Sequence, residues 1–126
     1  MDTKYIIDSS VFVAFYYEGD QNHENALAII KEISGKTLIV HPYVVSEVAT
    51  VLTYKISKKI AETFLSDVIG VDDIHIPNPD VLLESEFFIF QKKKISFTDA
   101  TLVYLAKKLN AKLITFDKQM ISLLKN

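Results

Sequence analysis

Apolar residues along this chain fall into short continuous runs and longer stripes at helical spacing. The runs lie in KYIID (4–8), KTLIVH (36–41) and AKLITF (111–116), and DDIHIP (72–77) holds a shorter one. Apolar runs without alternation are typical of strands buried on both faces of a parallel sheet. The sequence therefore predicts four strands inside the domain.

Between these runs, the pattern predicts helices. Ala26, Leu27, Ile30 and Ile33 form a clear helical stripe. The predicted helices lie within residues 9–19, 20–35, 42–55, 57–70, 78–94, 96–110 and 117–126. Strands that alternate with helices imply a parallel sheet covered on both faces. We therefore predict a three-layer α/β/α fold with a central parallel sheet of four to five strands.

Polar residues at the ends of these segments are typical helix caps. Ser9 or Ser10, Asp20, Ser57, either Ser96 or Thr98, and Asp117 are candidate N-caps, and Asn110 is a candidate C-terminal residue. Pro42 lies at a helix start, where proline is tolerated. The predicted helix boundaries rest on these residues.

Length and composition limit the class of protein. The chain has 126 residues, of which 49% are hydrophobic, and it contains no cysteine. We expect a single domain over residues 1–126, without disulfides, zinc–thiolate sites or a thiol nucleophile. No stretch approaches the ~20 apolar residues of a membrane span, and MDTKY is not a signal peptide. These features predict a cytoplasmic protein with no membrane partner.

The charge pattern limits how the chain can bind nucleic acid. The formal net charge is −2, which argues against coating nucleic acid by bulk charge. All fourteen basic residues are lysine, so arginine clamps on phosphate or guanine are excluded. An enzyme that binds phosphate through a cation held by carboxylates stays compatible with this composition.

Four acids stand at positions that matter in such a sheet. Asp8 and Asp117 directly follow the first and last predicted strands, and ligands bind outside the carboxyl ends of parallel strands. Each acid also has a simpler interpretation. Asp8 and Asp117 can cap helices, Asp99 can interact with a helix dipole, and Glu47 can be a solvated charge on a helix flank.

Taken together, the four acids favour a metal site. Carboxylates that converge at one sheet edge repel each other strongly unless a cation neutralises them. Hard divalent cations such as Mg²⁺ or Mn²⁺ prefer oxygen ligands and retain waters for substrate phosphates. The constellation therefore predicts a metal and a phosphate-bearing substrate.

The order of these motifs resembles the PIN-domain family, and most closely the VapC-type toxin ribonucleases of toxin–antitoxin pairs. The matching segments are IIDSSVFVAF (6–15), SEVATVL (46–52) and SFTDATLVYLAKKLNAKLITFDKQM (96–120), so the resemblance covers essentially the whole chain. It implies a Mg²⁺- or Mn²⁺-dependent endoribonuclease. Asp8 and Asp99 would be the main metal ligands, and Glu47 and Asp117 would complete the pocket.

The resemblance also implies partners and further site residues. It predicts an RNA substrate, a cognate antitoxin and a homodimer. The candidates for positioning substrate are Ser9, Ser10, Thr98, Thr115 and Lys118. The aromatic-rich segments VFVAFYY (11–17) and EFFIF (86–90) are expected to belong mostly to the core, and part of the first is a candidate partner surface. The three histidines lack metal-ligand spacing, so none is assigned a catalytic role.

Several other functions fit small α/β proteins. A phosphorelay receiver domain needs an acidic pair after the first strand, and a phosphatase with an aspartate nucleophile usually has Asp-x-Asp there; Asp8 stands alone. A PIN-like nuclease of RNA processing, outside any toxin pair, stays open. So does a PIN-like module that binds RNA or protein without catalysis, although binding alone does not need four acids.

Overall fold

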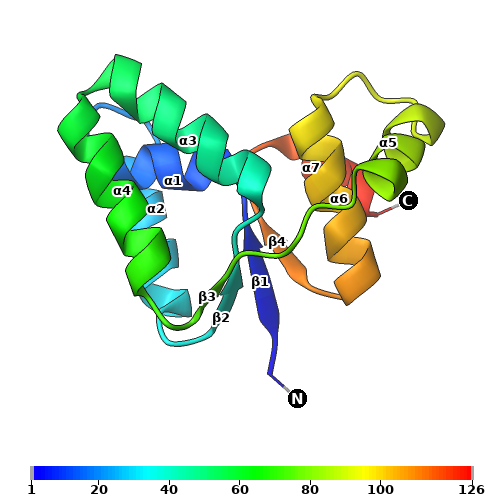
Figure 1. The fold of residues 1–126 in the computed structure, drawn as a ribbon, viewed down its shortest axis with the longest axis horizontal. Coiled ribbons are helices and arrows are strands. Elements are labelled where there is room, and N and C mark those ends of the chain that lie inside the picture. Colours follow the sequence, from blue (N-terminus) through cyan, green and yellow to red (C-terminus); the bar gives the residue numbers. More distant parts are fainter. Residues whose placement is uncertain (1, 126) are drawn as a thin grey trace.

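The structure, a computed structural model, describes residues 2–125 and shows an α/β fold (Figure 1). The four strands are β1 (Lys4–Ile7), β2 (Thr37–Ile39), β3 (Ile74–His75) and β4 (Lys112–Ile114). The helices are α1 (Ser9–Tyr16), α2 (His23–Ile33), α3 (Pro42–Lys55), α4 (Lys58–Gly70), α5 (Val81–Phe90), α6 (Phe97–Leu109) and α7 (Lys118–Leu124).

The four strands form one parallel sheet in the order β3-β2-β1-β4. In β1, Tyr5 pairs with Leu38 of β2 on one side and with Lys112 of β4 on the other. The chain builds the sheet outward from β1 to β3 and then returns to add β4 on the opposite side. The order of the strands therefore reverses between β1 and β4, where ligand sites of open parallel sheets lie.

Helices cover the sheet on two sides, with α1 to α4 on one side and α5 to α7 on the other (Figure 1). Ile6 and Ile7 of β1 are fully buried in the same core cluster as Val44, Val48 and Leu52 of α3. The prediction of a three-layer α/β/α fold with a parallel sheet of four to five strands is confirmed. The buried central strand also explains why residues 4–8 form a continuous apolar run.

Most predicted helix ends are confirmed by hydrogen bonds. The hydroxyl of Ser57 accepts from the amide of Ile60, and that of Ser96 accepts from the amide of Asp99. Pro42 is the first residue of α3, and Asn110 closes α6 in the left-handed conformation. These local signals therefore determine the ends of three long helices.

The starts of α1 and α2 differ from the prediction. The N-cap position of α1 is occupied by Asp8 and not by Ser9 or Ser10. Asp20 does not cap α2, because its Oδ1 accepts from the amide of Asn22 at 2.8 Å and forms a turn just before the helix. A short Asx turn satisfies Asp20 locally, so the N-cap position of α2 is Asn22, two residues later than predicted.

The two aromatic segments, both predicted to lie mostly in the core, differ in burial. No residue of α1 is exposed, so the prediction is confirmed for the first segment. In α5, by contrast, Ile89 and Phe90 are 75% and 83% exposed, so the expectation that EFFIF belongs mostly to the core is wrong for these residues. The reason is that α5 packs mainly against α6, which leaves its other sides open.

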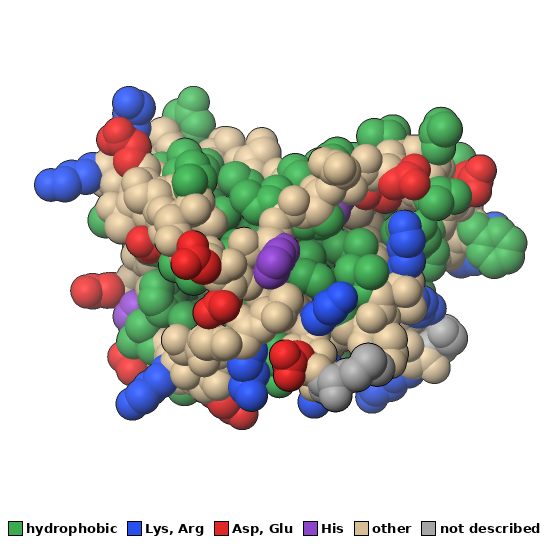
Figure 2. Space-filling view, turned by 60° about the horizontal axis from the view of Figure 1, so that its bottom comes forward, with side chains coloured by type: hydrophobic (Ala, Val, Ile, Leu, Met, Phe, Trp, Pro, Cys, Tyr) green, Lys and Arg blue, Asp and Glu red, His purple; other side chains and the backbone are tan. Residues whose placement is uncertain are grey.

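Charged side chains of both signs are intermixed on the face that lies at the amino ends of the strands, around a band of hydrophobic side chains (Figure 2). This mixture agrees with the small net charge of the chain. Among residues 2–125, no helix is both long enough and apolar enough to cross a membrane.

The end of α6 provides a test of the fold. Asn110 has φ of 51°, a conformation that residues other than glycine, asparagine and aspartate rarely adopt. We expect Asn110→Ala to lower the free energy of unfolding by about 1 kcal/mol, and the matched variant Asn110→Gly to keep it within a few tenths. Urea unfolding of the three proteins measures this, and a glycine variant less stable than the alanine variant would contradict it.

Candidate active site

Asp8 lies at the carboxyl end of β1 and is almost fully buried, with 4% of its surface exposed. Although it stands at the N-cap position of α1, its side chain makes no capping hydrogen bond. Instead, Oδ2 accepts from the hydroxyls of Ser10, at 2.8 Å, and Thr115, at 2.7 Å. Oδ1 has no hydrogen bond to any residue of the described chain. The simple capping interpretation of Asp8 is therefore wrong.

The two hydroxyls that bind Asp8 are themselves oriented by backbone amides. Phe116 N donates to Ser10 Oγ at 3.3 Å, and Asp117 N donates to Thr115 Oγ1 at 3.0 Å. An amide can only donate, so each hydroxyl uses its lone pair there and points its own proton at Asp8. Both hydroxyls therefore donate to the same oxygen, Oδ2. The end of β4 thus holds the Asp8 side chain in one orientation.

Asp117 and Asp99 occupy helix starts, as the sequence predicted. Asp117 caps α7, since its Oδ1 accepts from the amide of Gln119 at 2.8 Å. Asp99 lies in the first turn of α6, where Ser96 is the cap. These structural roles leave the remaining carboxylate oxygens of both residues available, so capping and a place in the site are compatible.

Electrostatics connect all four acids. Partial burial raises the pKa of Asp99, and the charges of Asp8, Asp117 and Glu47 raise it further, to about 6. Only part of this rise is opposed by a hydrogen bond from Ser96. Since each of the other three acids acts on Asp99, the fold brings the four within electrostatic reach at the carboxyl end of the sheet.

Nothing in the described chain neutralises these acids. Among residues 2–125, no lysine or histidine forms an ion pair with any of the four. Oxygen donors with excess negative charge fit a hard divalent cation. No three acids or histidines of the described chain stand close enough to hold a metal by themselves. Mg²⁺ needs only one or two carboxylates because it keeps several waters, so the donor set fits it.

Glu47 faces a groove between α3 and the start of α6. The groove has a volume of about 590 Å³ and is lined by Tyr43, Ser46, Glu47, Thr50, Val51, Phe97 and Thr98. Glu47 is exposed, as the simple interpretation expected, but it is exposed in this groove. The groove thus extends from Glu47 to Thr98, the residue next to Asp99.

The five predicted positioning residues have different surroundings. Ser10 and Thr115 bind Asp8, and Thr98 lines the groove. Ser9 Oγ is buried and has no hydrogen-bond partner in the part of the chain that the structure describes. Lys118 is exposed at the first residue of α7.

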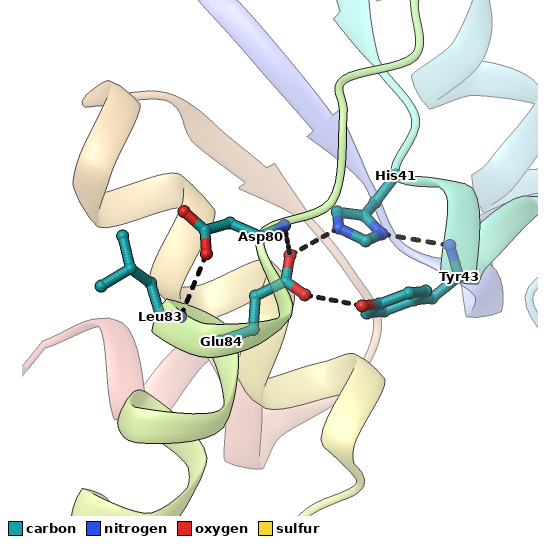
Figure 3. Close-up of polar contacts among 5 residues, drawn as sticks. All are labelled: His41, Tyr43, Asp80, Leu83 and Glu84. Atoms are coloured by element: carbon teal, nitrogen blue, oxygen red, sulfur yellow. Dashed lines mark hydrogen bonds and ion pairs between the residues drawn. The ribbon is translucent and has the colours of Figure 1, made fainter.

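A buried acid beside this groove was missed by the sequence analysis. Glu84 of α5 is only 3% exposed (Figure 3). Its Oε1 accepts from Tyr43 Oη at 2.7 Å, and its Oε2 accepts from His41 Nε2 at 2.9 Å and from the amide of Asp80 at 3.2 Å. These bonds tie α5 to the start of α3, the helix that carries Glu47.

The hydrogen bonds determine the charge state of this cluster. Burial alone would raise the pKa of Glu84, but the bonds from Tyr43, His41 and the Asp80 amide together lower it, so Glu84 is ionised. Burial lowers the pKa of His41, against the pull of Glu84. His41 Nδ1 accepts from the amide of Tyr43 at 3.1 Å, which requires the neutral ring with its proton on Nε2.

Two signals in the sequence point to this cluster. Glu84 is one of two acids, with Glu86, in the mostly apolar segment VLLESEFFIF, and His41 directly precedes Pro42, where the N-cap of a helix is expected. The segments are 43 residues apart, and their pairing depends on how α5 folds back over the sheet.

Comparison with known proteins agrees with this geometry. A model of the PIN domain matches residues 5–124. The chain belongs to the PIN-domain family. It is 30% identical over 122 residues to a VapC ribonuclease of Archaeoglobus fulgidus, an alignment that covers 90% of this PIN domain and 77% of the relative.

Two crystal structures share the fold of this PIN domain. VapC20 of Mycobacterium tuberculosis, described as a toxin that cleaves the sarcin–ricin loop, superposes with a TM-score of 0.82 at 18% identity and 94% coverage of both chains. PAE2754 of Pyrobaculum aerophilum superposes with a TM-score of 0.66 at 16% identity, over 97% of this chain and 85% of its own.

The raised pKa of Asp99 gives a stability prediction. Between about pH 4 and pH 6 the folded PIN domain binds more protons at Asp99 than the unfolded chain does, so this residue lowers stability as pH rises through that window. Asp99→Asn removes the effect. Because Asp99 is partly solvent-exposed, we expect the metal-free variant to be more stable than the parent by on the order of 1 kcal/mol at neutral pH.

Urea unfolding in EDTA, at pH values below and above the window, measures this difference. Asp72→Asn, in an exposed loop, is the matched control, and it should show no such pH dependence. An Asp99→Asn variant whose stability relative to the parent is the same at both pH values would contradict the prediction.

Proposed function

We propose that this PIN domain is a metal-dependent endoribonuclease that hydrolyses RNA phosphodiester bonds, and that it is the toxin of a type II toxin–antitoxin pair. The observation that carries this proposal is the buried Asp8 at the carboxyl end of β1, whose Oδ2 is held by two hydroxyls. The raised pKa of Asp99, caused by burial and by the charges of Asp8, Asp117 and Glu47, supports it. The similarity to a VapC ribonuclease, over nine-tenths of the chain, supports the same chemistry.

In this proposal, Asp8 and Asp99 hold Mg²⁺ or Mn²⁺, and Glu47 and Asp117 complete the pocket directly or through waters. When bound, the cation supplies an activated water and offsets the charge that grows on the phosphate. Asp8 presents a fixed carboxylate, because Ser10 and Thr115 hold its Oδ2 and leave Oδ1 available. We infer that Ser10 and Thr115 do not contact the substrate themselves and instead orient Asp8 for catalysis.

Three further residues are assigned to substrate or to the edge of the site. Thr98 lines the groove next to Asp99, so its hydroxyl is placed to bind a phosphate or ribose oxygen. Ser9 follows Asp8, and its buried Oγ has no hydrogen-bond partner among residues 2–125, so it is suited to an ordered water at the edge of the site. Lys118 follows Asp117 and supplies a point charge for phosphate.

Two other functions use the same fold. One is a PIN nuclease of RNA processing that has no antitoxin, and the other is a PIN module that binds RNA or protein without cleaving it. Expression with and without a neighbouring antitoxin gene separates the toxin from the processing enzyme, because only a toxin arrests growth when expressed alone. Cleavage by the purified protein separates both enzymes from the binding module.

Cleavage of total cellular RNA with Mg²⁺ or Mn²⁺ tests the proposed chemistry. We expect discrete fragments that EDTA abolishes. Substitution of a residue that only orients a metal ligand lowers activity by about 10–100-fold. Asp8 is proposed as a direct ligand, so Asp8→Asn should reduce the cleavage rate by more than about 100-fold. Glu62→Gln removes an exposed acid of α4 and is the control with unchanged activity. Full activity of Asp8→Asn, or of the parent in EDTA, would refute the proposal.

The hydroxyl of Thr115 gives a finer test of the same site. Thr115→Val removes the proton that points at Asp8 while it keeps the shape of the side chain. We expect a rate loss of about 10–100-fold, and Thr115→Ser should retain most of the activity. Equal rates for the valine and serine variants would show that this hydroxyl does not position Asp8.

We further propose that the protein forms a homodimer through α5. Leu82, Ile89 and Phe90 are each at least 75% exposed, and their i, i+7 and i+8 spacing places them on one side of the helix. We expect Ile89→Lys to shift the protein from dimer to monomer in light scattering coupled to gel filtration. Ile69→Lys, at an exposed apolar residue of α4, is the matched control. A monomeric parent protein would contradict this proposal.

A further inference from the structure

Two aromatic rings line the groove beside the carboxylates. Tyr43 comes from α3 and Phe97 from α6, and their ring centroids are 5.8 Å apart with an angle of 44° between the planes. Tyr43 precedes Glu47 by four residues, so the two share one face of α3. Phe97 precedes Asp99 by two residues. A group that contacts these rings therefore lies next to the acidic site.

The ring of Tyr43 is held in place by the buried cluster of Glu84 and His41 (Figure 3). Its hydroxyl donates to Glu84 at 2.7 Å, and its centroid lies 4.2 Å from that of His41. The hydrogen bond to Glu84, together with burial, raises the pKa of Tyr43 to about 12, so the ring stays neutral. With its hydroxyl turned away to Glu84, Tyr43 offers the groove an apolar surface.

The remaining groove residues contribute three hydroxyls, one acid and one apolar side chain. Ser46, Thr50 and Thr98 supply the hydroxyls, Glu47 the acid and Val51 the apolar side chain. Among residues 2–125 no lysine lines the groove, and the chain contains no arginine. A nucleic acid in this groove therefore cannot be held there by cationic side chains. Aromatic rings hold single-stranded RNA without positive charge, because every base has a face that can stack.

We propose that Tyr43, with Phe97 beside it, is a stacking platform for one base of single-stranded RNA, next to the phosphate that the carboxylates and their cation bind. In this arrangement Glu84 is a positioning residue that acts through the Tyr43 ring. The platform rests on the proposed ribonuclease function for the identity of its ligand. The proposal explains why the Tyr43 hydroxyl is hydrogen-bonded to a buried carboxylate and does not face the groove.

The test measures binding of fluorescein-labelled oligoadenylate by anisotropy, with Ca²⁺ as the cation and the RNA verified to be intact afterwards. Stacking of one base contributes enough binding free energy that Tyr43→Ala should weaken RNA binding by about tenfold. Tyr43→Phe keeps the ring but loses the hydrogen bond to Glu84, so its binding should lie between that of the parent and that of Tyr43→Ala. Tyr54→Ala removes a tyrosine of the same helix that is 87% exposed and lies outside the groove, so it should bind like the parent.

A second arm uses oligoadenylates in which one nucleotide at a time lacks its base. At one position we expect the missing base to weaken binding to the parent by about tenfold and to leave binding to Tyr43→Ala unchanged. Glu84→Gln should weaken binding of the intact RNA and have no further effect in the Tyr43→Ala background. A role of Glu84 in stability alone would give the same loss in both backgrounds.

Three results of the binding experiments would overturn the platform. They are parent-like binding by Tyr43→Ala, an equal loss in Tyr54→Ala, and base-removal penalties that are the same with and without Tyr43. These outcomes are independent of the nuclease proposal. Cleavage with unchanged KM and kcat in Tyr43→Ala would leave the nuclease intact and refute the platform. Binding that depends on Tyr43 without any cleavage would support the platform and refute the nuclease.

Discussion

Mutual repulsion among four carboxylates is the constraint that shapes this end of the molecule. Each acid is held by structure that does not depend on a metal: Asp8 by two oriented hydroxyls, Asp117 by its cap on α7, Asp99 by the first turn of α6, and Glu47 by α3. The repulsion that remains appears as the raised pKa of Asp99. We therefore expect stability to be reduced at the place where we propose that a cation binds, as is common at functional sites.

The sheet order is what makes this arrangement possible. Because β1 and β4 are neighbours, the residues that follow them, Asp8 and Thr115, meet although they are 107 positions apart. The hydrogen bond between Asp8 N and Ile114 O, 3.0 Å long, continues the pairing of the two strands up to the acids. The backbone of Asp8 is therefore anchored to the two central strands, which suits a group that must present fixed oxygen atoms.

A second buried charge, Glu84, fixes the start of α3, which forms one wall of the groove. Glu84 is the one buried residue of α5, while much of the apolar surface of that helix faces solvent. Its carboxylate joins α5 to the start of α3 through His41 and Tyr43. Breaking such a buried, fully hydrogen-bonded group is costly, so the start of α3 and the ring of Tyr43 have one preferred position. The exposed apolar side of α5 is the surface that we assign to a second copy of the chain.

The sequence by itself determined the parallel α/β class, most helix ends and the four acids, because continuous apolar runs, capping residues and strand-end positions are local signals. The caps at Ser57, Ser96 and Asn110 could be predicted without tertiary contacts, since a cap satisfies backbone groups within its own turn. Only the tertiary structure decided which hydroxyls hold Asp8, that α5 buries Glu84 and exposes Phe90, and that Tyr43 faces the groove. These features depend on contacts between segments far apart in the chain, and apolar patterning alone does not show which side of a helix finds a neighbour.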